Sequence, residues 1–416
     1  MDRLQTKRKN NLYTMLAILG FAVLFTLIEA NKDAVTWGGL LVTMIQKSLI
    51  FSVVAVAMNL LNGITGLFSL GQAGFMAIGA YVTAILTIPV DRVEGVYYMS
   101  GMAEWLLNIK RALSVLPEPL LIIVALLIGG CVAGIFAFLI GLPVLRLKSD
   151  YLAIATLGFS EIIRAILSAP QLDRITNGSY GLKNIPGFNF PTFGILPEGA
   201  GSLLVPYFFA VICIGFIVLL IRSTHGRSFL AIREDEIAAE AMGINLLKHK
   251  QMSFIISSFI TALAGGMLAM FMRSIEARTF SIMMTYDILL IVVIGGLGSI
   301  TGSVLGAFLV TFSKDWFLRF FDTPLVIGGM QVPLLRVGFR MVVFSVLLML
   351  VVLFYRRGIM GNKEFSWDGF RRLLRGKKAS TDMANEMVFD GQPMDRADLV
   401  DVPTTEGEGV DHSDSR

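Results

Sequence analysis

The sequence is dominated by uninterrupted apolar segments that are about as long as a lipid bilayer is thick. A helix needs about 20 apolar residues to cross a hydrocarbon core of roughly 30 Å. Only 16% of the 416 residues are charged, whereas soluble domains average about 25%. These features exclude an ordinary cytoplasmic enzyme and a disordered scaffold, and they predict an all-α polytopic integral membrane protein. Eight segments have the required length: Leu12–Ile28, Leu40–Leu61, Leu67–Ile88, Leu120–Leu142, Tyr151–Ser168, Leu203–Ile221, Met252–Met272 and Val337–Phe354.

A ninth apolar segment, Ile288–Phe312, is interrupted by a glycine-rich stretch at Gly295–Gly302. Broken backbone is tolerated at membrane depth only where protein or water covers it. We therefore expect at least one discontinuous or re-entrant helix, and about eight to ten transmembrane helices in all.

Basic residues predict how the segments are oriented, because Lys and Arg close to a span favour the cytoplasmic side. Such residues cluster before the first span, in the loop at 222–250 and after the last span. Both termini are therefore expected in the cytoplasm. The predicted organisation is a basic cytoplasmic N-terminus (1–11), a transmembrane domain (12–355) with a basic loop at 222–251, a basic amphipathic segment (356–378) that binds membrane lipid, and an acidic, disordered tail (379–416).

The sequence lacks the motifs that would support catalysis by this chain. It contains no G-x-x-x-x-G-K-[ST] phosphate loop, H-E-x-x-H, C-x-x-C or G-x-S-x-G motif. Cys131 and Cys213 lie inside apolar segments and are interpreted as packing residues. We expect no catalytic residues, no metal site, no cofactor bound by this chain and no nucleic-acid partner.

The loop at 222–250 is the most informative polar segment. Acidic residues crowd the start of its central part, alanines follow, and Gly243 comes after them. These are typical preferences for the start and end of a helix. The small side chains of Ala238 and Ala239 would let another protein approach the helix backbone closely, although a solvated connecting helix would have the same composition.

This loop resembles the cytoplasmic coupling segment of binding-protein-dependent ABC permeases, which reads E-A-A followed, after three residues, by G. Ala238, Ala239 and Gly243 occupy matching places, but Ile237 stands at the Glu position and Glu236 lies one place earlier. The wider sequence resembles the LivM-type membrane subunit of branched-chain amino acid importers over about residues 40–355. The stretches that carry this resemblance are His225–Asn245, Gly66–Gly74, Gly79–Tyr81, Leu145–Phe159 and Gly295–Gly306.

The resemblance implies a permease that carries leucine, isoleucine or valine across the cytoplasmic membrane of a bacterium or archaeon. It also implies four partners: a second, LivH-type permease subunit, two ABC ATPase subunits that bind ATP and magnesium, and an external solute-binding protein. The residues expected to contact the ATPase are Arg233, Glu234, Asp235, Glu236, Ala238, Ala239, Glu240 and Gly243.

Polar and small residues inside the predicted spans are candidates for the translocation path, because such residues are costly in lipid. Glu161 and Arg164 lie three residues apart on one helix face and could equally form a structural ion pair. The glycines could equally serve close helix packing. The candidates for the path are Ser69, Gln72, Gly74, Glu161, Gly296 and Gly298.

Two alternative functions remain open from the sequence. The same kind of importer could carry urea, amides or another amino acid, because the binding protein selects the solute. More remotely, the chain could be a secondary transporter acting alone. That alternative would need ion-coupling carboxylates in the membrane, and only Glu161 lies away from the ends of the spans.

Overall fold

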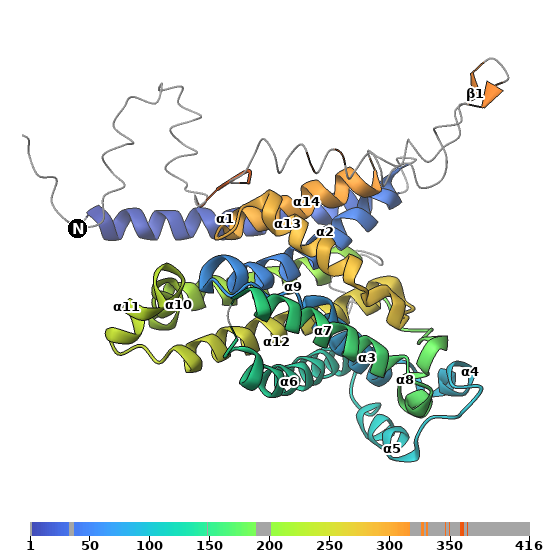
Figure 1. The fold of residues 1–416 in the computed structure, drawn as a ribbon. Helices are drawn as coiled ribbons and strands as arrows, with labels where there is room; N and C mark the ends of the chain where they lie inside the picture. The colour runs from blue at the N-terminus through green and yellow to red at the C-terminus, as the bar shows by residue number, and fades with distance from the viewer. Residues whose placement is uncertain are drawn as a thin grey trace, which may run out of the picture. The chain divides into compact units, whose positions relative to one another are not determined.

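A computed structural model describes residues 2–32, 37–147, 149–188 and 201–316, and the short pieces 326–327, 330–331, 346, 349, 358–361 and 364. The chain divides into a unit at 1–364 and a second at 365–416, which lies outside the described residues. Apart from four short 3-10 helices, the helices of the described part (Figure 1) are α1 (Asp2–Ala30), α2 (Gly38–Asn59), the π-helical η1 (Leu60–Thr65), α3 (Gln72–Thr87), α4 (Val93–Val96), α5 (Glu104–Leu113), α6 (Glu118–Val144), α7 (Ser149–Leu167), α8 (Asp173–Thr176), α9 (Gly201–Arg222), α10 (Thr224–Glu234), α11 (Glu236–Ala241), α12 (Leu246–Met272), α13 (Ile282–Gly295) and α14 (Ile300–Asp315).

The prediction of an all-α membrane protein is confirmed. Among the described residues, strand structure is limited to the pair β1 (Val326–Ile327) and β2 (Met330–Gln331) and one isolated bridge. Five helices of this part are long and apolar enough to cross a bilayer, or seven if two bent pairs each form one span. The predicted span Val337–Phe354 lies outside the described residues except for Val346 and Met349. A total of eight to ten spans therefore stays a prediction, as do the boundaries of the N-terminal and C-terminal segments.

The predicted discontinuous helix is confirmed at the glycine-rich stretch. α13 has 14 residues and α14 has 16, which makes them about 21 and 24 Å long, less than the hydrocarbon thickness of a bilayer. Gly296 and Gly298 between them have φ values of 115° and 93°, a region that residues with a Cβ rarely adopt. A side chain at Gly295 would collide with the backbone of Gly302. The two short helices are thus packed directly against each other.

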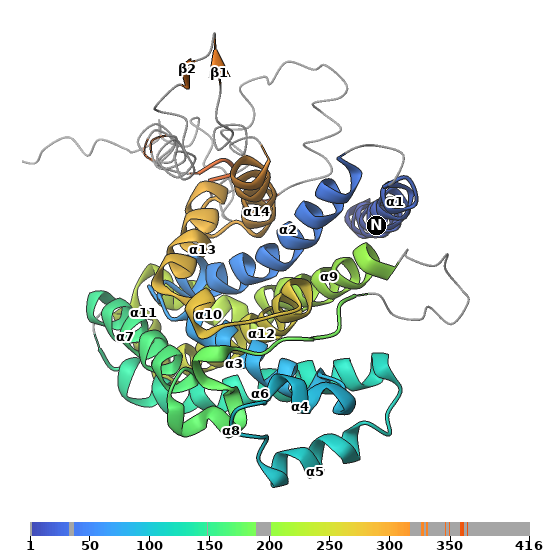
Figure 2. The same cartoon turned by 90° about the vertical axis from the view of Figure 1, so that its right-hand side faces the viewer.

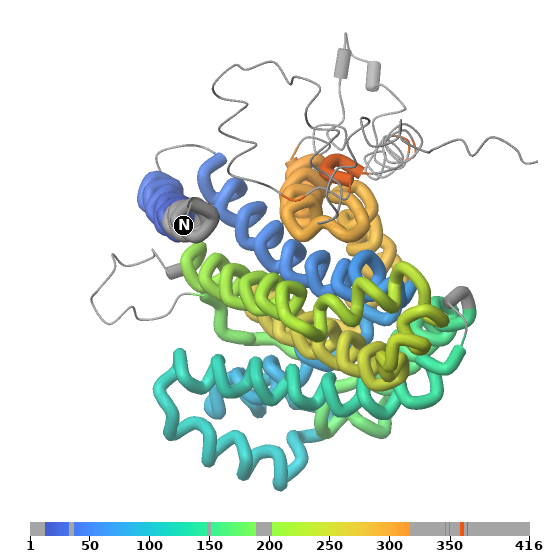
Figure 3. Tube along the Cα trace, turned by 90° about the vertical axis from the view of Figure 1, so that its left-hand side faces the viewer, coloured from blue at the N-terminus to red at the C-terminus, as the bar shows by residue number. Residues whose placement is uncertain are grey.

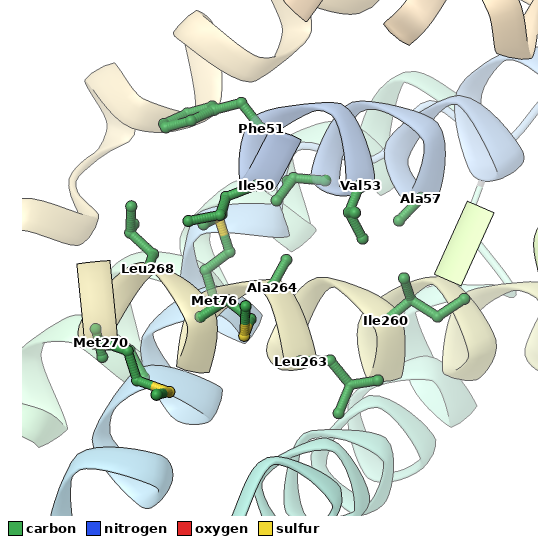
Figure 4. Close-up of a cluster of buried hydrophobic side chains, with 14 of the residues drawn as sticks. Ile50, Phe51, Val53, Ala57, Met76, Ile260, Leu263, Ala264, Leu268 and Met270 are labelled. Carbon is green, nitrogen blue, oxygen red and sulfur yellow. The ribbon is translucent and has the colours of Figure 1, made fainter. Parts of the chain in front are cut away.

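The core lies where α2, α3 and α12 meet, and Figure 4 shows side chains from these helices in contact there. In α2 with η1, 78% of the residues in the most apolar window are buried, and in α12 72% are; for α6, α9 and α1 the shares are 39%, 33% and 11%. Close approach of α3 to α12 depends on Gly79 and Gly265, since a Cβ at either would collide with the other helix's backbone. Figures 2 and 3 show α13 and α14 on one side of this core and α6 on the other.

The helix α3 begins later than the predicted span Leu67–Ile88. Gly66 has a φ of 77° and ends η1, and Ser69 N–H donates to Asn62 Oδ1 at 3.1 Å. These contacts hold residues 67–71 in an irregular conformation, so that α3 starts at Gln72.

The connection from Pro89 to Pro119, for which the sequence shows no clear helical period, contains the amphipathic helix α5. Its Lys110 side chain is almost fully buried, and Nζ donates to Ile85 O at the end of α3 (2.7 Å). Burial lowers the pKa of Lys110 to about 8. α5 is therefore fixed to the helical core by a buried amine.

Candidate functional site

The segment between α9 and α12 consists of two short helices rather than one. α10 ends at Glu234 and α11 begins at Glu236, and the Asp235 carboxylate accepts hydrogen bonds from the N–H groups of Ile237 (2.8 Å) and Ala238 (3.0 Å). Gly243, with a φ of 84°, follows the end of α11. Asn245 then caps α12 by accepting from Lys248 N–H at 3.0 Å. These consecutive caps fix the direction of each helix locally.

α11 presents one face to the protein and another to its surroundings. Ala239 is buried, whereas Ile237 and Met242 are 82% and 84% exposed. Glu236 pairs with Lys250 of α12 at 2.6 Å. Of the predicted coupling residues, Glu234, Asp235, Glu236, Ala238, Glu240 and Gly243 are exposed. α11 is thus a helix anchored on one side to α12, with apolar and acidic side chains available on the other.

Arg233, at the end of α10, connects this segment to the membrane domain. Its Nη1 donates to Gly63 O in η1 at 2.7 Å, and its side chain packs beside Gly66. Short π-helical segments frequently occur at functional sites. Here the arginine lies against such a segment, 170 residues away in the sequence.

Asn59 extends the connection from α2 to the break between α13 and α14. Its Oδ1 accepts from Gly298 N–H at 2.8 Å, and its Nδ2 donates to Ser299 O and Ser303 Oγ, both at 2.8 Å. The sequence analysis missed this residue. Its only signal was an amide side chain inside a predicted span. Arg233, η1, Asn59 and the break therefore form one continuous series of contacts.

Of the path candidates, Ser69 contacts Asn62 of η1, and Gly296 and Gly298 contact Asn59 at the end of α2. Gln72 Nε2 donates to Ser257 Oγ (3.3 Å), and its Oε1 accepts from Thr261 (2.6 Å), so its amide joins α3 to α12. Ser69 is buried, and its Oγ has no hydrogen-bond partner among the described residues. These four residues come from two separate parts of the chain: Ser69, Gly296 and Gly298 meet at the junction of α2 and η1, and Gln72 joins the first part to α12.

Gly74 and Glu161 lie elsewhere, where α3 meets α7. A Cβ at Gly74 would come within 2.8 Å of Ser160 Cα, which explains the small residue there. Glu161 pairs with Arg164 of its own helix at 2.7 Å, and both side chains are partly exposed. The structure does not bring these two candidates together with the glycines at 296 and 298.

No group of three or more metal-binding side chains occurs in the part of the chain that the structure describes. The features described above are helix ends, glycine breaks and hydrogen bonds between helices. Such features suit a protein that changes shape.

Comparison with known proteins identifies the family. Residues 40–355 match the family model described as the permease component of branched-chain amino acid transport systems. The chain is 32% identical over 308 residues to the high-affinity branched-chain amino acid transport system permease protein LivM of Escherichia coli, a match covering 68% of this chain. That match spans 65% of the Escherichia coli protein, less than two thirds of its length.

Two proteins of Methanocaldococcus jannaschii are also similar. The probable branched-chain amino acid transport permease protein LivM is 25% identical over 76% of this chain and 91% of its own length. The probable permease protein LivH is 26% identical over 62% of this chain and 82% of its own length. No solved structure matches. Because the family model covers more than half of the sequence, the chain belongs to the family of branched-chain amino acid transport permease components and is a multi-pass membrane protein.

Proposed function

We propose that the chain is a membrane subunit of an ABC importer that carries leucine, isoleucine or valine across the bacterial or archaeal cytoplasmic membrane. Separate subunits would hydrolyse ATP, and this chain would have no catalytic residues. The family and the names of the similar proteins support the substrate class. Similarity to both LivM and LivH supports assembly with a second, LivH-type permease subunit.

The observation that carries the proposal is the series of contacts from Arg233 through Gly63 to Asn59 and Gly298. The exposed face of α11 would dock on an ATPase subunit, with Ile237 and Met242 as its apolar contacts. Because caps and the Glu236–Lys250 ion pair hold α11, a push on it would reach α12 and η1. The break between α13 and α14 would then move with η1.

The proposed path follows the same region. The Ser69 hydroxyl and the backbone around Gly296 and Gly298 would face the solute as helices separate. Gln72 would hold α3 to α12, and Gly74 would keep α3 close to α7. Glu161 already pairs with Arg164 within one helix, which does not favour the alternative of an ion-coupled transporter acting alone.

Co-purification and uptake test this function together. We expect the chain, purified in mild detergent, to retain an ABC ATPase, and the double variant Ile237→Asp/Met242→Asp to lose it because charges replace the apolar docking face. Val115→Asp is the control for association, since Val115 is 86% exposed but lies in the loop before α6. Uptake of radiolabelled leucine should require ATP and fall at least tenfold in the double variant.

Three results would contradict the proposal. One is normal ATPase association and uptake in the double variant. Another is leucine uptake that persists after ATP depletion, which would favour a secondary transporter. The third is uptake of labelled urea that valine does not inhibit, which would favour the urea or amide alternative.

A further inference from the structure

At the end of α12 that is opposite to α11, the structure contains an open pocket of about 600 Å³, called the cavity below. Its volume lies within the range of about 300–1,000 Å³ that is usual for small-molecule sites. It lies among the start of α2 and the ends of α12 and α14. The lining residues are Gly39, Leu40, Thr43, Met44, Lys47, Phe271 and Asp315.

One cation and one anion lie in the wall of this cavity. Lys47 Nζ of α2 pairs with Asp315 Oδ2 of α14 at 2.6 Å, although the two residues are 268 positions apart in the sequence. The two side chains are 32% and 27% exposed, so both remain accessible from the cavity. Lys47 Nζ also lies 6.0 Å from the centre of the Phe51 ring, a contact that it could keep if Asp315 found another partner.

The rest of the lining is mainly apolar. Leu40, Met44 and Phe271 contribute aliphatic and aromatic surface, and Thr43 contributes a hydroxyl that donates to Gly39 O at 2.8 Å. An α-amino acid with an aliphatic side chain has the complementary groups: one carboxylate, one ammonium and one apolar substituent on a single carbon. Urea and amides lack both charges.

We propose that this cavity binds a zwitterionic aliphatic amino acid by exchange of ion-pair partners. The ammonium group of Lys47 takes the ligand carboxylate, and the carboxylate of Asp315 takes the ligand ammonium. Two ion pairs replace one, no proton is transferred, and neither protein charge is left unpaired at any stage, which is the costly state for partly buried ions. The side chain of the ligand lies against Met44 and Phe271. This inference rests on the proposed function, and it assigns the substrate class to particular residues.

The location is consistent with an entry site. Lys47 lies nine residues into α2, about 14 Å along its axis, and the lining residues place the cavity toward the end of α12 distant from α10 and α11. With the proposed orientation, that is the outer side, from which an importer receives its solute.

A second ion pair, which shares only α14 with the first, provides the matched control. Lys314 Nζ of α14 pairs with Asp287 Oδ2 of α13, also at 2.6 Å, and neither residue lines the cavity. A merely structural role for Lys47 and Asp315 predicts that the two pairs respond alike to substitution. The proposal predicts that only the first pair affects ligand binding.

The test is binding of tritiated L-leucine to the full chain in nanodiscs, with D-leucine and urea as competitors. We expect Lys47→Met and Asp315→Asn each to weaken binding at least tenfold, and Lys314→Met and Asp287→Asn to change it less than twofold. The reversed double variant Lys47→Asp/Asp315→Lys keeps an ion pair. In this variant the protein groups that bind the carboxylate and the ammonium of the ligand change places, while the apolar wall that binds the ligand side chain stays where it is. Because this inverts the arrangement around the α-carbon, we expect the variant to prefer D-leucine over L-leucine.

Absence of leucine binding by the wild-type chain would overturn the inference, as would equal binding by Asp315→Asn and Asp287→Asn. An unchanged preference for L-leucine in the reversed variant, at wild-type affinity, would also overturn it. These failures differ from failure of the proposed function. ATP-dependent leucine uptake that is normal in Asp315→Asn cells would contradict the cavity site alone, whereas ATP-independent uptake would contradict the importer.

Discussion

The central helices α2 and α12 and the peripheral helices α6 and α9 are all long enough to cross a bilayer, but their surroundings differ. α6 and α9 carry charges only at their ends, Glu118 and Arg222, and most of their residues are not buried. α2 and α12 are mostly buried and contain many buried polar side chains. These include Gln46, Ser48, Ser52, Asn59, Gln251, Ser253, Ser257, Ser258 and Thr261. In a lipid solvent, hydrophobicity marks the surface, and polar residues mark contacts between helices. The spans with many buried polar side chains are therefore the place to look for function.

The largest difference in stability is expected when one glycine of a central helix and one glycine of a peripheral helix are each replaced. A Cβ at Gly265 of α12 would collide with the Met76 carbonyl of α3, whereas a Cβ at Gly215 of α9 would meet nothing within 4 Å. We expect Gly265→Val to cost about 3 kcal/mol, since overpacking against backbone cannot relax. Gly215→Val should cost less than about 0.5 kcal/mol. Thermal unfolding in detergent, followed by size-exclusion chromatography, measures both, and equal midpoints would contradict the central role of α12.

An intermediate effect is expected from Asn59→Leu, which makes α2 more apolar while keeping a similar volume. The change removes the acceptor of Gly298 N–H, and loss of a buried partner costs about 1–3 kcal/mol. Thr26→Val in α1 is the control, because Thr26 Oγ1 donates only within its own helix, to Val23 O at 2.7 Å. We expect leucine uptake to fall strongly in Asn59→Leu and to stay normal in Thr26→Val. Normal leucine uptake in both variants would show that transport does not require the Asn59 side chain.

The smallest expected effect is on the pH dependence of stability, and it comes from Lys110, a buried amine outside the predicted spans. The folded-state pKa of Lys110, about 8, lies below its ordinary value of 10.5. Between these two values the unfolded chain holds the proton that the folded chain has released, so the contribution of Lys110 to stability rises from pH 8 to pH 10.5. Lys110→Met should lack this rise. Unfolding midpoints of both proteins at pH 7.5, 9 and 10 test it, and parallel curves would show that Lys110 does not titrate as its burial predicts.

Much of the fold could be predicted because a bilayer imposes a length on every span. The segments Leu40–Leu61, Leu120–Leu142 and Met252–Met272 lie within the observed helices. The glycines at 295–302 marked the break because they remove the steric preference for a helix. The start of α3 could not be predicted, since residues 67–71 include three apolar residues and continue directly into the span, and the Asn62–Ser69 contact that holds them depends on η1.

In the candidate site too, contacts between neighbouring residues could be predicted from the sequence, and contacts between distant residues could not. The caps at Asp235 and Asn245 use residues two or three positions away, so local chemistry was enough to locate that segment. The partners of Arg233 and Asn59 lie 170 and 240 residues away. Those pairings depend on how the helices pack, which no local pattern contains.

The unbroken length of α12 has a mechanical consequence. The helix runs from the α11 end to Phe271 at the cavity. Phe271 lies 25 residues beyond Leu246, about 38 Å along the axis, so a tilt of about 5° at the α11 end shifts Phe271 sideways by about 3 Å. That shift is comparable to the 2.6 Å between Lys47 and Asp315. If α12 moves as a rigid rod, as the proposed function requires, a small rotation at its α11 end is enough to move the wall of the cavity at its other end.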